Sequence, residues 1–245
     1  MKHKDNSDYQ APIIILVRPQ LAKNVGMVAR AMMNCGLSKL RLVTPRENHL
    51  SAEALSASSG AQVILEQAVV YSTLEEALSD LHYVVATTAR SRGLSKPVYF
   101  PDELVPKVAE KIFQNQQVAF VFGPERTGLE NNDIILADSL LTIPLNPVHS
   151  SLNLAQAVLL VGWIWWQQSL KKRKIVVKSN SSAPKKELDF FLKFLIKHLE
   201  NKNYFQIENK KEKMKQNLKN IFTKSALTSA EIKTLYRVIK RLLSE

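Results

Sequence analysis

The sequence contains a single cysteine, Cys35, among its 245 residues. One cysteine excludes an intrachain disulfide and a cysteine-rich zinc site, and it suits a reducing compartment. The five histidines show no spacing typical of metal ligands, so we expect no metal. The first ten residues, MKHKDNSDYQ, lack the apolar core of a secretion signal. These absences together predict a cytoplasmic protein.

Long apolar runs are also missing. The longest, Leu154–Trp166, contains Gln156 and falls short of the roughly 20 residues that a membrane span requires, so we expect no membrane association. A hydrophobic content of 45% is nevertheless enough to bury a core. The formal net charge of +12 predicts a polyanionic partner, most commonly a nucleic acid. For the basic tail, a lysine-rich source proteome remains an alternative explanation.

Several common active-site motifs are absent. The segment Gly123–Gly128 lacks the Gly-Lys-Ser/Thr ending of a P-loop, and no Gly-x-Gly-x-x-Gly follows either of the first two predicted strands. His149 stands beside two serines, but the Gly-x-Ser-x-Gly elbow of a serine hydrolase is missing. Nucleotide triphosphatases, dinucleotide-dependent enzymes and serine hydrolases are therefore not supported.

What the sequence does contain is an alternation of short apolar runs and helical patterns as far as about residue 170. We expect strands at Ile13–Val17, Leu40–Val43, within Val63–Tyr71, His82–Ala86, Val118–Phe122 and Leu140–Leu145. The first helix is expected to be capped by Asn24 and to end at Gly36. Further helices are expected within Ser51–Gly60, after a capping box up to Leu78, and over Glu103–Phe113. Asn131–Ala137 has room for at most two helical turns, and a long helix is expected from Leu152. This alternation predicts an α/β domain with a mostly parallel sheet.

The chain changes character after residue 170. We expect a flexible arm over residues 1–10, a domain over 11–170, a basic linker over 171–184 and a helical extension over 185–245. Apolar residues at helical spacing mark two helices in the extension, within Lys185–Tyr204 and Glu208–Lys224. Thr228 and Glu231 form a capping box that opens a third.

Three polar loop clusters follow apolar runs: residues 18–30, 123–128 and 146–153. The carboxyl ends of parallel strands share one edge of a sheet, and ligands bind at that edge. We therefore expect the clusters to form one site. Each cluster alone is a weak signal.

The three clusters resemble the motifs of the SPOUT superfamily, in its TrmH-like branch of RNA ribose 2′-O-methyltransferases. The matching segments are Asn24–Met32 (NVGMVARAM), Phe122–Leu129 (FGPERTGL), and Ile143–Pro144 with Ser150–Val158 (SSLNLAQAV). Within the branch the likeness is greatest to the TrmJ family of tRNA methyltransferases, because Thr87–Arg92 (TTARSR) also resembles a stretch of that family. The resemblance covers residues 11–170.

The resemblance implies a deep C-terminal trefoil knot, a homodimer, S-adenosyl-L-methionine as cofactor and tRNA as partner. It also implies that the backbone of Gly123, Ile143 and Leu152 holds the cofactor, and that Thr87, Thr88, Ala89, Ser150 and Ser151 line the same pocket. A glycine at position 123 suits this role, since only glycine lets a ligand approach the backbone without meeting a Cβ. Core packing is an alternative role for Ile143 and Leu152.

By the same resemblance, Arg30 acts at the target ribose. Guanidinium is essentially never deprotonated in proteins, so we expect it to grip a phosphate and stabilise the developing alkoxide instead of acting as a base. A surface salt bridge is the alternative. Asn24, Glu125, Ser151 and Asn153 match other polar motif positions, although Glu125 and Asn153 are also candidates for capping loops and helix starts. Lys23 departs from the family, which more often has glycine there.

The implied reaction is 2′-O-methylation of a pyrimidine at the first nucleotide of the tRNA anticodon loop. Two alternatives remain open: a ribosomal RNA 2′-O-methyltransferase, and a catalytically silent RNA-binding protein that has kept the fold.

Overall fold

The computed structural model describes residues 10–88, 96–148, 151–171 and 182–244. Its elements follow the chain in the order β1 (Ile13–Val17), α1 (Ala22–Asn34), β2 (Leu40–Val43), α2 (Ala52–Ser58), α3 (Gln62–Glu66), β3 (Val69–Tyr71), α4 (Leu74–Leu78), β4 (Tyr83–Thr87), β5 (Val98–Tyr99), α5 (Pro101–Phe113), β6 (Val118–Phe122), α6 (Asn131–Ile135), β7 (Ser139–Leu141), α7 (Leu154–Lys171), α8 (Lys185–Asn201), α9 (Glu208–Lys224) and α10 (Ser229–Leu242). None of the helices in these ranges is long and apolar enough to cross a membrane.

The strands form one sheet in the order β3-β2-β1-β6-β4-β7-β5, and each pairing among them is parallel. β1 lies between β2 and β6, where Ile14 pairs with Leu40 on one side and Phe120 on the other. All five residues of β1 are buried. A continuous apolar run is typical of a parallel strand that is covered on both faces. The predicted parallel α/β sheet is confirmed.

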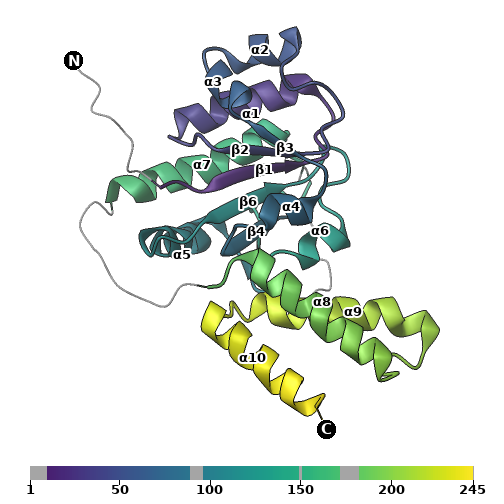
Figure 1. The fold of residues 1–245 in the computed structure, drawn as a ribbon. Helices are drawn as coiled ribbons and strands as arrows, with labels where there is room; N and C mark the ends of the chain where they lie inside the picture. Colours follow the sequence, from purple (N-terminus) through teal and green to yellow (C-terminus); the bar gives the residue numbers. More distant parts are fainter. Residues whose placement is uncertain (1–9, 89–95, 149–150, 172–181, 245) are drawn as a thin grey trace.

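Helices cover both faces of the sheet (Figure 1). Ile14 and Leu16 of β1 point into a core shared with α1, α5 and α7. Ile13 and Ile15 point to the opposite face, into a core shared with α4 and α6. Alternate side chains of one strand therefore hold the two helical layers together, because successive Cβ atoms point to opposite faces.

Most predicted elements are present, and β1, β2 and β6 have the predicted bounds. The capping box predicted at the start of α4 is present only in part: Thr73 Oγ1 accepts from the backbone N–H of Glu76 at 3.2 Å, whereas Glu76 Oε2 accepts from the backbone N–H of Ser72 at 3.3 Å and not from that of Thr73. The predicted cap of α1 is wrong. The helix begins at Ala22, so Asn24 lies inside it, and Glu47 Oε2 accepts from the backbone N–H of Ala22 at 2.7 Å.

The three C-terminal helices share a small core of their own, which contains Leu188, Phe191, Leu192 and Ile232. The rings of Phe191 and Phe222 meet edge to face with 5.1 Å between their centroids. In Figure 1 these helices lie together beside the sheet layer that carries α4 and α6. Helix α9 also contacts α6, where Gln216 Nε2 donates to Asn132 Oδ1 at 3.1 Å.

Candidate functional site

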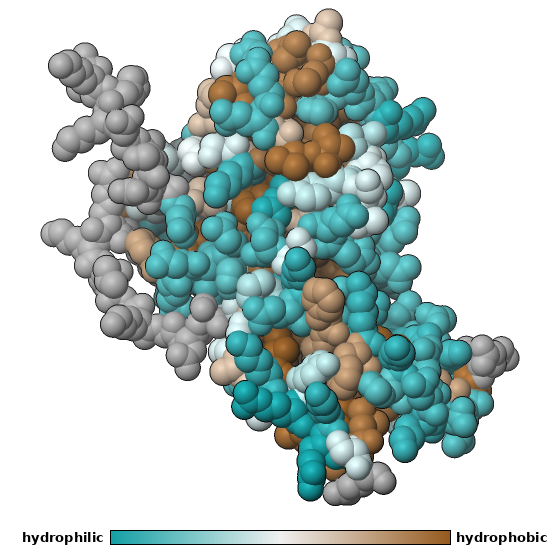
Figure 2. All heavy atoms as spheres, viewed as in Figure 1, coloured by the Kyte–Doolittle hydropathy of each residue, from teal (hydrophilic) through white to brown (hydrophobic). Residues whose placement is uncertain are grey.

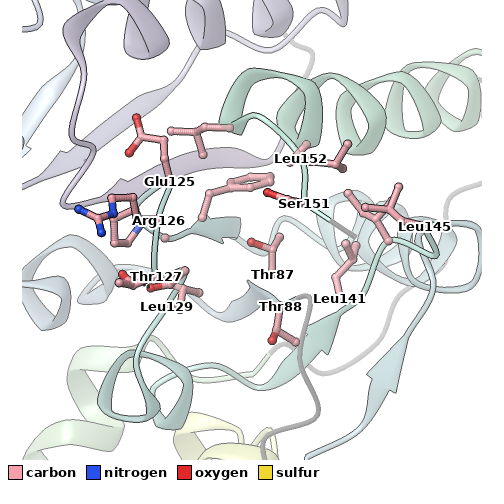
Figure 3. Close-up of a pocket in the computed structure, with 17 residues that line it drawn as sticks. Thr87, Thr88, Glu125, Arg126, Thr127, Leu129, Leu141, Leu145, Ser151 and Leu152 are labelled. Carbon is pink, nitrogen blue, oxygen red and sulfur yellow. Dashed lines mark hydrogen bonds between the residues drawn. The ribbon is translucent and has the colours of Figure 1, made fainter. Parts of the chain in front are cut away.

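A cavity of about 260 Å³ opens at the carboxyl ends of β4, β6 and β7. It is lined by residues from the loops after these strands and from the start of α7: Thr87, Thr88, Phe122–Leu129, Leu141, Ile143, Leu145, Ser151, Leu152, Leu154 and Ala157. Figure 3 shows Glu125 and Arg126 at one end of the cavity and the leucines Leu141, Leu145 and Leu152 at the other. The polar loops predicted to converge at one edge of the sheet do so.

The loop after β6 closes tightly on itself. The backbone N–H of Gly128, which has φ of +66°, donates to the carbonyl oxygen of Pro124 at 2.8 Å. A Cβ at position 123 would lie 2.2 Å from the backbone nitrogen of Leu129 and 2.4 Å from the carbonyl carbon of Gly128. Gly123 is therefore required by the return of its own loop, which is a different reason from the ligand approach argued from the sequence.

Glu125 connects this loop to α1. Its Oε1 accepts from Asn24 Nδ2 at 2.8 Å, and its Oε2 accepts from the backbone N–H of Gln20 at 3.0 Å. Asn24 is buried, so an unmatched amide there would be costly. Both carboxylate oxygens are thus used to fix the loop after β1 against the loop after β6.

Asn153 extends the same network to α7. Its Nδ2 donates to Asn24 Oδ1 at 3.1 Å, and its Oδ1 accepts from the backbone N–H of Ala155 at 2.9 Å. The backbone N–H of Asn153 also donates to Gln156 Oε1 at 3.1 Å. The capping role left open for Asn153 is therefore present. The chain Glu125–Asn24–Asn153 joins all three sequence motifs through side-chain hydrogen bonds.

The remaining predicted pocket residues divide into two groups. Thr87, Thr88, Gly123, Ile143, Ser151 and Leu152 line the cavity. Thr87 Oγ1 donates to the carbonyl oxygen of Val121 at 2.9 Å, which ties the end of β4 to β6. Ala89 and Ser150 lie outside the described residues.

Arg30 does not line the cavity of its own chain. It is exposed on α1 and makes no ion pair with another described residue. At about 1.5 Å rise and 100° per residue, Arg30 lies about 9 Å further along the helix than Asn24 and about 120° around it. Asn24 therefore faces the pocket network while Arg30 faces away from it.

A second polar link, between the residue after β1 and helix α6, was not predicted from the sequence. Arg18, directly after β1, donates to Asp133 with Nη1 at 3.2 Å and Nη2 at 2.6 Å. The bond to Asp133, a residue of α6, raises the pKa of Arg18 above its ordinary value. Arg18 has φ of +48°, a conformation uncommon outside glycine. An arginine between a buried strand and Pro19 is a weak signal, and its partner lies 115 positions away.

The described residues hold no group of three His, Cys, Asp or Glu side chains that fits a metal ion. The cavity instead combines backbone from three loops with apolar walls and few charges. That combination suits an organic ligand with a flat apolar part and polar ends.

A family model described as the SpoU rRNA Methylase family matches residues 11–163. LasT of Escherichia coli, named an uncharacterized tRNA/rRNA methyltransferase, is 42% identical over 146 residues, 60% of this chain and 64% of LasT. TrmJ of Pseudomonas aeruginosa, a tRNA (cytidine/uridine/adenosine-2′-O-)-methyltransferase, is 42% identical over 145 residues, 59% of this chain and 56% of TrmJ. The matches thus span less than two thirds of either relative.

The crystal structure of TrmJ from Z. mobilis ZM4 superposes on this chain with a TM-score of 0.86 at 42% identity. It covers 95% of this chain, and this chain covers 99% of it, so the likeness includes the C-terminal helices. These comparisons confirm the resemblance that the three motifs indicated. The family model matches well over half of the sequence, and the chain therefore belongs to the SpoU rRNA methylase family.

Proposed function

We propose that this protein is an S-adenosyl-L-methionine-dependent tRNA 2′-O-methyltransferase of the TrmJ type, which modifies a pyrimidine ribose at the first nucleotide of the anticodon loop. The observation that carries the proposal is the Glu125–Asn24–Asn153 network, which holds three family motifs around one cavity. The likeness to TrmJ proteins supports tRNA as the substrate class. A tRNA substrate also accounts for the net charge of +12. A cytoplasmic location follows from such a substrate.

The cavity fits the cofactor that this reaction needs. The apolar walls formed by Leu129, Leu141 and Leu152 suit the faces of an adenine, and the backbone of the surrounding loops offers donors and acceptors to its edge. The hydroxyl groups of Thr88 and Ser151 lie on the same lining and suit the polar parts. When bound, the cofactor supplies a methyl group activated by its sulfonium.

In this proposal Arg30 acts on the RNA and not on the cofactor. Its guanidinium grips the phosphate of the target nucleotide and stabilises negative charge on the ribose 2′-oxygen as that oxygen gives up its proton to water or a neighbouring oxygen. Because Arg30 faces away from the cavity of its own chain, the arginine at each cavity is Arg30 of the partner subunit. Glu125 and Asn153 hold the loops in place, as their hydrogen bonds indicate.

A homodimer is therefore part of the proposal. Helix α7 carries apolar side chains that its own chain leaves open: Leu159, Leu160 and Trp163 are 40%, 39% and 52% exposed. They share one helical face, since they are spaced by three and four residues. Met33 of α1, which packs against α7, is 42% exposed as well. An apolar surface of this kind on a folded chain suits a subunit interface.

We assign the methyltransferase unit to residues 11–170 and an RNA-binding extension to 185–245, joined by a basic linker over 171–184. The family resemblance further implies that the segment from β6 to α7 is threaded as a trefoil knot. β7 pairs with β4 and not with β6, so the chain crosses over β4 between these two consecutive strands.

The direct test is incubation of the protein with labelled cofactor and bulk tRNA, followed by mapping of the methylated nucleotide. A 2′-O-methyl group on the first anticodon-loop nucleotide supports the proposal. Methylation of ribosomal RNA alone would instead favour the rival substrate. Calorimetry that detects no cofactor binding would favour the catalytically silent RNA-binding protein.

A further inference from the structure

A second cavity lies between α8 and α10, away from the pocket described above. It measures about 650 Å³ and is lined by Glu187, Phe190, Phe191, Lys193, Phe194, Lys197, Ile232, Lys233, Tyr236 and Arg237. We call it the α8/α10 groove. Phe190 is 65% exposed and Tyr236 is 39% exposed, which is unusual for large aromatic side chains. In Figure 2, brown atoms emerge between teal ones in the lower part of the molecule, where Figure 1 shows α8 and α10.

The aromatic rings in the groove form a supported platform. The ring of Phe194 contacts those of His198 and Tyr236, with centroid distances of 4.5 Å and 4.2 Å. Phe190 lies one helical turn before Phe194, so both rings are on the same side of α8. Phe191 beneath them belongs to the small core of the extension. The groove is therefore held open by packing, and its outer rings remain available to a ligand.

Cations border the aromatic platform. Lys197, Lys233 and Arg237 are exposed and make no ion pair with another described residue. Lys193 pairs with Asp189 at 2.7 Å, and Glu187 is the single carboxylate among the lining residues. Exposed aromatic rings between unpaired cations are the combination that binds single-stranded nucleic acid, because bases stack on the rings while phosphates meet the charges.

We propose that the α8/α10 groove binds an unpaired stretch of RNA, with bases stacked on Phe190 and Tyr236 and phosphates held by Lys197, Lys233 and Arg237. The identification of that RNA as the loop of a tRNA rests on the proposed function. The binding of unpaired RNA in the α8/α10 groove does not. A second copy of this chain fits less well. A two-fold interface would bring the same cations of both copies together, and like charges repel.

The groove is tested with the full chain and a fluorescein-labelled oligouridine, which has no secondary structure of its own. Loss of one stacking ring weakens such binding about 5- to 100-fold. We expect that loss in the dissociation constant for Phe190→Ala and again for Tyr236→Ala. Phe190→Trp should restore the affinity, since it returns an aromatic face. Ile221→Ala is the matched control, because Ile221 is 49% exposed on α9 and does not line the groove.

The salt dependence separates rings from charges. Each phosphate contact removed lowers the slope of log affinity against log salt by about 0.7 for a single strand. Lys197→Ala and Arg237→Ala should each reduce the slope by about that amount, whereas Phe190→Ala should weaken binding without changing it. Lys39→Ala, an exposed lysine of the α/β part, should change neither quantity.

Wild-type affinity for oligouridine in both Phe190→Ala and Tyr236→Ala would overturn the assignment. The assignment would also fail if these substitutions weakened the binding of an RNA duplex as much as the binding of oligouridine. Conversion of a dimer to monomers by Phe190→Ala, with oligouridine affinity unchanged, would show a subunit interface and also overturn it. Methyl transfer is measured separately. A wild-type chain that binds oligouridine through Phe190 but does not methylate tRNA would refute the proposed function and leave the groove assignment standing.

Discussion

Lys185 Nζ lies 2.5 Å from Asp138 Oδ1, and this contact joins the first turn of α8 to the residue before β7. Both side chains are largely buried, at 11% and 2% exposed. Asp138 Oδ2 also accepts from the backbone N–H of Val84 at 2.7 Å. The backbone N–H of Lys185 donates to the carbonyl oxygen of Leu81 at 2.6 Å. The C-terminal extension is thus attached to the sheet at the start of α8.

Removal of the lysine should destabilise the protein. Lys185→Ala leaves the carboxylate of Asp138 buried without its cation, and such a loss costs about 3–5 kcal/mol of the free energy of unfolding. Urea titration followed by circular dichroism measures it. Lys186→Ala is the control, because that side chain is exposed. A loss in Lys185→Ala no larger than in the control would contradict a stabilising role for the pair.

Gly123→Ala should weaken cofactor binding while leaving the protein folded. The added Cβ would clash with the backbone at Gly128 and Leu129, so the loop that lines the cavity must shift. We expect cofactor affinity, measured by calorimetry, to fall at least about tenfold, with about 1–3 kcal/mol of stability lost. Gly60→Ala introduces strain at φ of +96° without any clash and serves as control. Unchanged cofactor affinity in Gly123→Ala would remove the loop from the binding site.

Arg30→Ala should lower the rate of tRNA methylation about 100- to 1000-fold, the usual effect of removing one group that stabilises transition-state charge. Cofactor affinity should stay unchanged, because Arg30 does not line the cavity of its own chain. Single-turnover kinetics with saturating tRNA measures the rate. Lys23→Ala, an exposed neighbour on the same helix, should retain most of the activity. A normal rate in Arg30→Ala would refute the assigned role.

The proposed crossed arrangement, in which Arg30 of one subunit serves the cavity of the other, has its own test. A mixture of Arg30→Ala and Gly123→Ala chains forms hybrid dimers, and each hybrid contains one undamaged cavity that faces one undamaged arginine. Activity should therefore reappear on mixing two weak variants, up to about a quarter of the wild-type value for random exchange, as expected of paired two-fold sites. If mixing restores no activity although hybrid dimers form, arginine and cavity belong to the same chain.

Stability should depend on pH through Lys96. Burial lowers the pKa of Lys96 from 10.5 to about 8, although its Nζ donates to the carbonyl oxygens of Ile135 and Ala137 at 3.0 Å and 2.5 Å. Between pH 8 and 10 the unfolded chain binds more protons than the folded chain, so the free energy of unfolding rises with pH. The gain is up to about 2 kcal/mol.

The upper limit of that window is set by Tyr83, whose pKa burial raises to about 12, so that stability falls again above pH 10. Urea titrations at pH 7, 8, 9 and 10 on wild type and Lys96→Met give the measurement. The free energy of unfolding of wild type should rise relative to that of Lys96→Met as the pH increases from 8 to 10. Lys111 titrates in the same direction, because burial lowers its pKa, but it is present in both proteins. Parallel curves would exclude Lys96 as the source.

The sequence predicted the strands well because buried parallel strands are short apolar runs with polar loops after them. It also predicted, from the same loops, that the three motifs would meet at one edge of the sheet. It did not predict β5 (Val98–Tyr99), since a two-residue edge strand next to Pro97 leaves no periodic pattern. The strand β7 ends at Leu141 although the predicted strand continues to Leu145. Pro144 has no N–H to donate, so the predicted strand could not have run unbroken to Leu145.

Long-range polar contacts were the other gap. Asn24 has the residue type of a helix cap, but its amide serves Glu125 and Asn153, which lie more than 100 positions further along the chain. The helix is capped instead by Glu47, which is distant in sequence. Local preference for a cap was overridden by a buried partner, because an unsatisfied buried amide costs more than a cap contributes.

The exposed face of α7 leads to the last prediction. Trp163 is 52% exposed on a helix whose other side packs against α1 and α5. Trp163→Glu should convert the dimer to monomers in light scattering, because a subunit interface cannot bury two unpaired carboxylates. Methylation should then fall as far as in Arg30→Ala, since no partner brings the arginine. Cofactor affinity should fall much less, because one chain lines the cavity.

Ile221→Glu, a charge added at an exposed apolar site on α9, should leave the dimer intact. A dimer that survives Trp163→Glu would place the interface elsewhere.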